Sequence, residues 1–320
     1  MRKTTKVWLI IAGFLVVVGC IIFGGVMSML KWDFTKLSTV KYETNTYEIN
    51  EVFNEISMNT DTADIIFALS DDGKCRVECY EQENAKHSVS VEDDVLVVKI
   101  NNRKSWYDYI GLCFSSPKIT IYLPKTEYNA LSIDGSTGNV EIPKYYSFEN
   151  VDISLSTGDV DFCAATSGSI KIKTSTGNIC VENISTGLLD LSVSTGKVTV
   201  SGVTCEGNIT VDVSTGKANL TDIACKNVIS SGSTGNITLS NVIATEKFSI
   251  KRSTGNVKFN SCDAAEIYVK TSTGDVTGSL LSDKVFITDT DTGSVDVPKT
   301  ATGDRCEINT DTGDIEIIID

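Results

Sequence analysis

Hydroxyl side chains carry most of the potential chemistry in this sequence. The tripeptide Ser-Thr-Gly recurs through the second half of the chain, and Asp-Thr-Gly replaces it in the last two regular copies. A hydroxyl becomes a nucleophile only beside a general base. The single histidine, His87, lies outside the repeats among polar residues, where we expect it to be exposed and inactive. Because the hydroxyls recur in every copy, we interpret them as structural and predict no catalytic residue, no cofactor and no enzyme.

Aspartates near the C-terminus are the candidate metal ligands. Asp289 and Asp291 precede Asp311 and Asp314 in the last two repeats. If neighbouring repeats stack as strands, Asp291 and Asp311 lie about 5 Å apart. Ca²⁺ binds such oxygen ligands, although the glycine-rich nonapeptide of calcium-binding β-rolls is absent. A solvated acidic end that discourages aggregation is the alternative interpretation.

Cysteine spacing argues against a zinc site. The ten cysteines include no Cys-x-x-Cys pair, which is the spacing that zinc sites commonly use. Once the repeats are aligned, Cys205 and Cys225 share a column in neighbouring repeats and could reach each other as a disulfide. The alternative is that both pack as small apolar side chains.

Three aromatic residues form the candidate partner contact. Trp106, Tyr107 and Tyr109 lie within four consecutive positions. Exposed aromatic side chains of this kind contact sugars, lipid headgroups or proteins, whereas buried ones form core. Both interpretations remain open for this segment.

The repeat itself predicts the fold. Its glycines follow one another at steps of 19 or 20 residues from Gly138 to Gly313, and apolar residues alternate on either side of them, as in Leu191, Val193, Val198 and Val200. Such alternation indicates strands with one buried face. A unit this short buries that face only by stacking on its neighbours. We therefore predict an all-β protein, a parallel β-solenoid of about ten rungs spaced ~4.8 Å apart.

Each Ser-Thr-Gly marks a corner of a rung. Glycine accepts positive φ angles that other residues avoid. Asn or Asp follows most of the corner glycines, as Asn139 and Asp159 do, and these residues tolerate left-handed conformations next best. We therefore expect them to share the strained geometry of the bend. Lys197 and Lys217 take this position in two adjacent rungs and interrupt any uniform ion-binding ladder.

The two ends of the solenoid depart from the repeat. A degenerate first rung begins near Val52, with Ala63 in the place of glycine, and residues 71–116 are expected to form an inserted β-meander that caps the stack. The last strand, around Ile315, is expected to have an open edge that could accept a partner's strand. The predicted segments are a cytoplasmic tail (1–6), a transmembrane helix (7–30), a stalk (31–50), degenerate rungs with the inserted cap (51–130) and the regular solenoid (131–320).

An apolar segment near the N-terminus predicts a membrane anchor. Residues 7–30 carry no charge, and a helix of that length spans about 36 Å, enough to cross the ~30 Å core of a bilayer. The basic residues before it favour a cytoplasmic N-terminus and an extracellular rod. The alternative is a lipoprotein in which Cys20 is lipidated, but mostly apolar residues follow Cys20.

Net charge restricts the partners. The formal net charge is −14 at pH 7, and an acidic protein repels phosphate backbones. We therefore exclude nucleic acid and expect the lipid bilayer, through residues 7–30, and a cell-wall polymer or a protein as partners.

At this point the chain resembles a known family. The N-terminal anchor, "DTADI" at 61–65, "SPKITIYLP" at 116–124 and the serial "STGN" and "STGD" units are similar to the bacterial putative-adhesin family of β-strand-repeat, membrane-anchored proteins of unknown function. The resemblance covers nearly all of residues 50–320. It implies a cell-surface β-solenoid, and relatives in cell-envelope stress systems imply a sensing or accessory role.

Three functions follow as hypotheses. The first is a non-enzymatic, adhesin-like or scaffold role at the bacterial cell surface, and the second is an accessory or sensor protein of an envelope stress response. The third is a polysaccharide-active enzyme, since many β-solenoids cleave polysaccharides with clustered carboxylates, but the repeats show no nucleophile with a base beside it.

Overall fold

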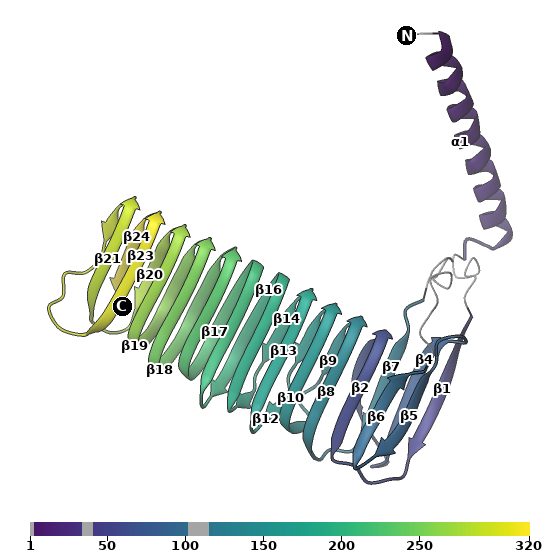
Figure 1. The fold of residues 1–320 in the computed structure, drawn as a ribbon, viewed down its shortest axis with the longest axis horizontal. Coiled ribbons are helices and arrows are strands. Elements are labelled where there is room, and N and C mark those ends of the chain that lie inside the picture. The colour runs from purple at the N-terminus through teal and green to yellow at the C-terminus, as the bar shows by residue number, and fades with distance from the viewer. Residues whose placement is uncertain (1–2, 34–40, 102–114) are drawn as a thin grey trace.

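The strands of this protein stack into one elongated rod, and the described residues include one helix, which lies at the N-terminal end (Figure 1). The computed structural model describes residues 3–33, 41–101 and 115–320. The helix, α1 (Lys3–Met29), contains the segment Thr5–Met29 with a mean hydropathy of 2.8, which is long and apolar enough to cross a membrane. Its length and composition agree with the predicted anchor.

The strands fall into an irregular N-terminal group and a regular series. The N-terminal group comprises β1 (Tyr42–Ile49), β2 (Glu55–Thr62), β3 (Asp64–Leu69), β4 (Cys75–Gln82), β5 (His87–Glu92), β6 (Val95–Ile100) and β7 (Lys118–Leu123). The series comprises β8 (Glu127–Thr137), β9 (Val140–Ile142), β10 (Ser147–Thr157), β11 (Val160–Phe162), β12 (Ala165–Thr166), β13 (Ser169–Thr176), β14 (Ile179–Glu182), β15 (Ser185–Thr186), β16 (Leu188–Cys205), β17 (Asn208–Thr234), β18 (Ile237–Thr254), β19 (Val257–Thr273), β20 (Val276–Leu280), β21 (Lys284–Thr292), β22 (Val295–Asp296), β23 (Asp304–Thr312) and β24 (Ile315–Ile319).

Rungs stack in parallel and in register, which confirms the predicted β-solenoid. Between β16 and β17, Val193 pairs with Val213 and Val198 pairs with Ala218. These inward residues are at most 1% exposed and belong to one hydrophobic cluster that runs from Ile49 to Ile317. Because each fully buried aliphatic side chain contributes about 1.5–3 kcal/mol, these columns are the main source of stability.

Corner glycines stack on one another's backbone. Gly216 has a φ of 141°, a region of the backbone map that only glycine occupies without strain. A Cβ atom at this position would collide with the carbonyl oxygen of Gly196 in the preceding rung. The same collision recurs between successive corner glycines. Glycine is therefore required at this corner by both conformation and space.

Side chains that follow the corner glycines bind the next rung. Asn139 Oδ1 accepts a hydrogen bond from the Asp159 N–H at 2.9 Å, and Asp159 Oδ1 accepts one from the Asn178 N–H at 2.7 Å. Asn178 Oδ1 accepts the next, from the Lys197 N–H at 3.1 Å. None of these residues has a positive φ. The expectation that they share the glycine's conformation was wrong, because their side chains extend a ladder of backbone hydrogen bonds instead.

The second corner of the rung holds the left-handed residues. Six residues after the corner glycine, the φ angle lies between 50° and 63° in five consecutive rungs. Gly, Asn and Asp tolerate this conformation best. The five positions are occupied by Asn183, Gly202, Asp222, Asn241 and Ser261.

The first rungs do not follow sequence order. β2 and β3 pair in parallel with β8 and β9 on one side and with β6 and β7 on the other. Residues of β6 and β7 alternate inward as rung residues do, and Leu96, Val98, Ile119 and Ile121 are buried. Residues 71–116 are therefore not a meander throughout, because β6 within them joins with β7 to make an outer rung.

Antiparallel strands close this end of the rod. β4 runs antiparallel to β7 and β1, and β5 runs antiparallel to β6. We call β1, β4 and β5 the cap. Residues 42–49 therefore form β1 rather than part of a stalk, because Tyr47 and Ile49 pack against the core.

The last repeat returns into the stack. β23 pairs in parallel with β19 on one side and with β21 on the other. β24 likewise lies between β20 and β22. The prediction that the last strand ends the stack was wrong: β21 and β22 form the terminal rung. Ile315 and Ile317 are consequently buried between neighbours.

A buried lysine links β21 to β23 and β19 in this arrangement. Lys284, at the start of β21, is fully buried, and its Nζ lies 2.7 Å from Asp263 Oδ1 and 3.5 Å from Asp304 Oδ2. Nζ also donates to the Ala264 carbonyl at 2.8 Å and to the Ser282 hydroxyl at 2.9 Å. The ammonium group is thus fully partnered, and it joins the terminal rung to strands β19 and β23.

We expect Gly216→Ala to lower the free energy of unfolding by about 3 kcal/mol or more, because conformational strain and a backbone collision add. Gly73→Ala is the matched control, since Gly73 has a φ of 72° but open space around it, and it should cost about 1 kcal/mol. Urea denaturation measures both. Equal losses would show that stacking of the corners contributes nothing.

We expect Lys284→Met to cost about 1–3 kcal/mol, because the buried Ala264 carbonyl loses its donor and the Asp263 carboxylate, 27% exposed, loses its cation. The loss should concentrate at the C-terminal end and accelerate hydrogen exchange in β21 and β22. Lys226→Met removes an ion pair with Glu246 whose side chains are 50% and 54% exposed, and should cost less than about 0.5 kcal/mol. Unchanged exchange in the Lys284→Met protein would contradict the assigned role.

Candidate functional site

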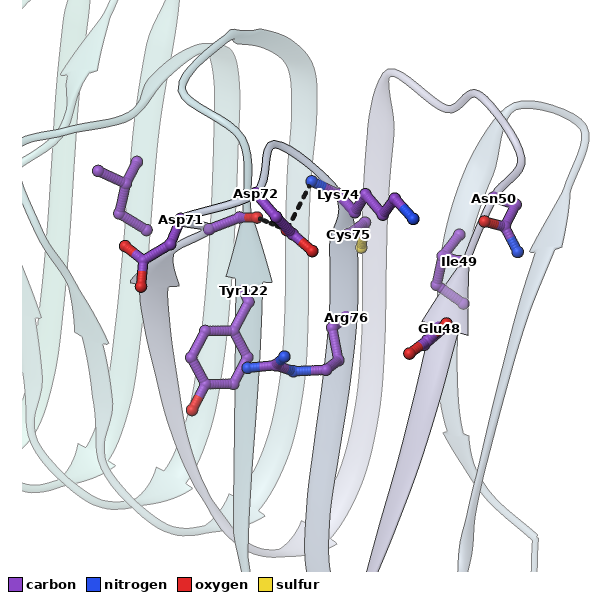
Figure 2. A pocket seen from close by; sticks show the side chains of 11 residues that line it. Glu48, Ile49, Asn50, Asp71, Asp72, Lys74, Cys75, Arg76 and Tyr122 are labelled. Atoms are coloured by element: carbon purple, nitrogen blue, oxygen red, sulfur yellow. Dashed lines mark hydrogen bonds between the residues drawn. The ribbon is translucent and has the colours of Figure 1, made fainter.

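A pocket opens beside the cap, where β1 ends and the loop between β3 and β4 turns. Its volume is about 250 Å³, and Figure 2 shows the side chains that line it. The lining mixes charges of both signs with one aromatic ring. The residues around it are Glu48, Ile49, Asn50, Leu69, Ser70, Asp71, Asp72, Lys74, Cys75, Arg76 and Tyr122.

Charged groups in this pocket are held in place by neighbours. The Arg76 guanidinium carbon lies 4.2 Å from the centre of the Tyr122 ring, a cation–π contact. Asp72 accepts hydrogen bonds from the Ser70 hydroxyl at 2.8 Å and the Lys74 N–H at 3.1 Å (Figure 2). These two bonds, the Ser70 hydroxyl first, lower the pKa of Asp72. Burial raises the pKa of the Cys75 thiol to about 12, so it is no nucleophile at neutral pH. The pocket suits a small polar ligand better than covalent chemistry.

The single histidine lies inside the cap and not on the surface. His87 is 3% exposed. Its Nδ1 lies 2.7 Å from Glu81 Oε2, and its Nε2 lies 3.0 Å from Thr60 Oγ1. The expectation of an exposed histidine was wrong. Alternate residues of β4 face inward, so Glu81 follows Val77 and Cys79 into the interior, and His87 is buried against Glu81.

Glu81, His87 and Thr60 reproduce the order acid, imidazole, hydroxyl of hydrolase triads. Their burial argues for a structural role, since Thr60 is 5% exposed within an inward column. Glu81 Oε1 also accepts from Asn45 Nδ2 at 2.8 Å, and Glu81 Oε2 accepts from the His87 backbone N–H at 2.7 Å. A buried polar network that is satisfied in this way specifies one packing arrangement.

Cys79, Glu81 and His87 are the one trio of potential metal ligands gathered within 4.8 Å in the part of the chain that the structure describes. Both His87 nitrogens and both Glu81 oxygens already have close hydrogen-bond partners. Burial, and next the Glu81 carboxylate, raise the pKa of the Cys79 thiol to about 12. The trio therefore fits a hydrogen-bonded network better than a metal site.

The predicted calcium ligands are dispersed. Asp291 and Asp311 lie in adjacent strands, since Thr290 pairs with Thr310 and Thr292 with Thr312. Asp314, however, accepts hydrogen bonds from the N–H and hydroxyl of Ser294 at 2.7 and 2.8 Å, and these bonds lower its pKa. With Asp289, the four candidates supply no trio of ligand atoms within 4.8 Å among the described residues.

Two further candidates have different outcomes. Cys205 and Cys225 are both free thiols, so the hypothetical disulfide is not formed. Burial raises the pKa of the Cys225 thiol to about 12, as expected of an apolar filler. Trp106, Tyr107 and Tyr109, the candidate partner contact, lie outside the described residues.

Fold and sequence together define a β-solenoid that carries an N-terminal apolar helix. Two overlapping segments, residues 53–213 and 205–320, match the Toastrack DUF4097 family. The two matches span nearly the whole rod, and the chain belongs to this family. No curated protein matches it.

Several solved structures are similar. A "putative adhesin" from Bacteroides fragilis is 18% identical, with a TM-score of 0.43 over 87% of this chain and 97% of that one. A "putative adhesin" from Parabacteroides merdae is 15% identical, with a TM-score of 0.48 over 87% and 96%. A "putative lipid binding protein" from Parabacteroides distasonis is 18% identical, with a TM-score of 0.45 over 75% and 95%.

We expect His87→Ala to destabilise the cap by about 2–3 kcal/mol, because a buried carboxylate and a buried hydroxyl lose their partner. Hydrogen exchange should accelerate in β4 and β5, while the rungs beyond β10 stay protected. Glu83→Ala, an exposed neighbour, is the control and should change neither. A His87→Ala protein with an unaltered cap would show that the network does not stabilise it.

Proposed function

We propose that this protein is a membrane-anchored rod on the bacterial cell surface, with a non-enzymatic, adhesin-like or scaffold role. The observation that carries the proposal is the single continuous core, which includes residues from Ile49 in the cap to Ile317 in the last strand. Such a core makes a stiff spacer, because the described rungs stack on one another around it without a break. An apolar helix at one end supplies an anchor of membrane-spanning length.

The outer faces of the rod support the same role. In a parallel stack, equivalent outward residues recur every ~4.8 Å, so a repeating polymer meets a repeating surface. Membership of the Toastrack DUF4097 family agrees with a rod of this kind. The buried position of the one acid–histidine–hydroxyl chain argues in the same direction.

An accessory or sensor role in the envelope stress response is the second candidate. The pocket of Figure 2 favours it, because Glu48, Ile49 and Asn50 on its rim lie at the end of β1, the first strand after the apolar helix. A small polar ligand bound there would stabilise the cap by mass action. The change in stability of the cap would then be the signal that reaches the apolar helix.

We expect protease added to intact cells to degrade the rod, because the proposal places residues 41–320 outside the membrane. Immunoblots against the rod follow the loss, with a cytoplasmic protein as the protection control. Membrane vesicles carrying the full chain should also sediment with purified cell wall, and vesicles without it should not.

The other outcomes discriminate between the hypotheses. A rod that resists protease until the cells are lysed would contradict the surface location. Release of reducing sugar from a polysaccharide panel would establish the enzyme instead. Induction by wall-active antibiotics without any wall binding would favour the sensor.

A further inference from the structure

An arginine interrupts one of the inward columns in the middle of the rod. Three residues before the corner glycine, successive rungs place Val193, Val213, Gly232, Arg252 and Thr271. Arg252 is 5% exposed, yet it occupies a column that is otherwise made of small or apolar residues. A buried guanidinium normally requires a carboxylate beside it to offset the loss of its hydration.

Gly232 makes the space that the guanidinium fills. A Cβ on Gly232 would collide with Arg252 Nη1. Nη1 donates to the Ser231 carbonyl at 2.7 Å, and Nη2 donates to the Ser230 hydroxyl at 2.8 Å. Nε is buried and has no partner among the described residues. Gly232 and Arg252, in adjacent rungs, therefore act as a pair. We call the guanidinium group of Arg252 in the space beside Gly232 the cationic floor.

Lysines complete a cationic hollow over this floor. Lys251 and Lys270 pair across β18 and β19 and are both exposed. Together with Arg252 they line a hollow of about 430 Å³, whose rim also carries serine hydroxyls from four rungs. The one carboxylate on the rim, Asp212, already accepts a hydrogen bond from the Ser231 hydroxyl. Positive charge in the hollow therefore exceeds negative charge, in a protein of formal net charge −14.

We propose that this hollow binds the phosphate group of a thin, linear polyanion, an inference that rests on the surface role proposed above and names its partner class. A tetrahedral oxyanion accepts hydrogen bonds from several directions, which matches a guanidinium floor, two ammonium groups and a rim of hydroxyls. Burial lowers the pKa of Arg252 to about 10, and the Asp212 carboxylate on the rim opposes this shift only in part. A bound phosphate would add a counter-ion inside the hollow.

The shape of the charge distribution favours a polymer over a bilayer. Carboxylates flank the hollow, at Asp190 on one side and on the other at Glu307, whose Oε2 lies 2.6 Å from Arg305 Nη2. A planar anionic membrane would have to approach these carboxylates together with the lysines. A single extended chain can contact the lysines without covering Asp190, which lies three rungs from Lys251.

The test uses the full chain in nanodiscs of neutral phosphatidylcholine and a synthetic glycerol-phosphate hexamer as the probe, with calorimetry at about 50 mM NaCl to limit screening. We expect Lys251→Gln/Lys270→Gln to raise Kd about tenfold or more. The matched control is Lys197→Gln/Lys217→Gln, another exposed lysine pair in adjacent rungs, which should change Kd less than about twofold.

A third variant addresses the floor itself. Arg252→Thr places in this rung the residue that the next rung has at Thr271, so it should fold, and a melting curve verifies that it does. It should weaken hexamer binding as strongly as the double lysine variant. A folded Arg252→Thr protein with unchanged Kd would contradict the proposed floor.

Several outcomes would overturn the inference. The first is that the hexamer does not bind, and the second is that both double lysine variants lose hexamer affinity equally. The third is that phosphatidylglycerol vesicles bind as tightly per phosphate through the same residues, which would make the bilayer the partner. If the Lys251→Gln/Lys270→Gln protein still sediments with cell wall, this site fails while the surface role stands.

Discussion

The rod depends on one repeated contact, the stacking of each corner glycine on the carbonyl group of the glycine in the rung before it. The contact leaves no room for a side chain, since a Cβ atom on Gly216 would collide with the carbonyl oxygen of Gly196. It therefore fixes the distance between rungs at the corner, and the backbone hydrogen bonds of the flanking strands fix it elsewhere. A constant rung length of 19 or 20 residues follows, because a longer rung would move every inward residue out of its column.

Departures from this constraint are confined to the ends, where a rung has only one neighbour. At both ends the order of the rungs in space differs from their order in the sequence. β6 and β7 lie outside β2 and β3, and β23 lies inside β21. An open parallel edge invites pairing with other chains. The antiparallel cap covers one end, and at the other β21 presents Asp289 and Asp291, charges that discourage such pairing.

Periodicity allowed the fold to be predicted, but not the order of the rungs. The columns of Leu191, Val193, Val198 and Val200 required parallel stacking. Stacking order at the C-terminal end was beyond prediction, because β21 and β23 satisfy the same columns and either could lie beside β19. The second corner was predictable, because Asn, Gly, Asp, Asn and Ser recur six residues after the glycine, and residue type alone indicates left-handed backbone there.

Site residues were harder to predict, because their roles depend on partners far away in the sequence. His87 resembled a surface residue from its neighbours, and only the inward row of β4 places Glu81 against it. Arg252 stands in an inward column that the repeat identifies, but its consequence appears only when Gly232 is seen to be its neighbour. A residue that breaks a column therefore has to be interpreted together with the residue one rung away.

Among the described residues, Arg252 and Lys284 are the buried arginine and lysine side chains, and their surroundings differ. Lys284 has a carboxylate at 2.7 Å, a carbonyl and a hydroxyl, so its charge is fully compensated within the fold. Arg252 has a carbonyl and a hydroxyl, while its Nε lacks a partner and its environment opens toward two lysines. A fold that needed only to fill the space beside Gly232 could have used an apolar side chain at no electrostatic cost. The only carboxylate among the described residues that line the same hollow is Asp212 on its rim, and a guanidinium in that setting is consistent with a further counter-ion that arrives from outside the protein.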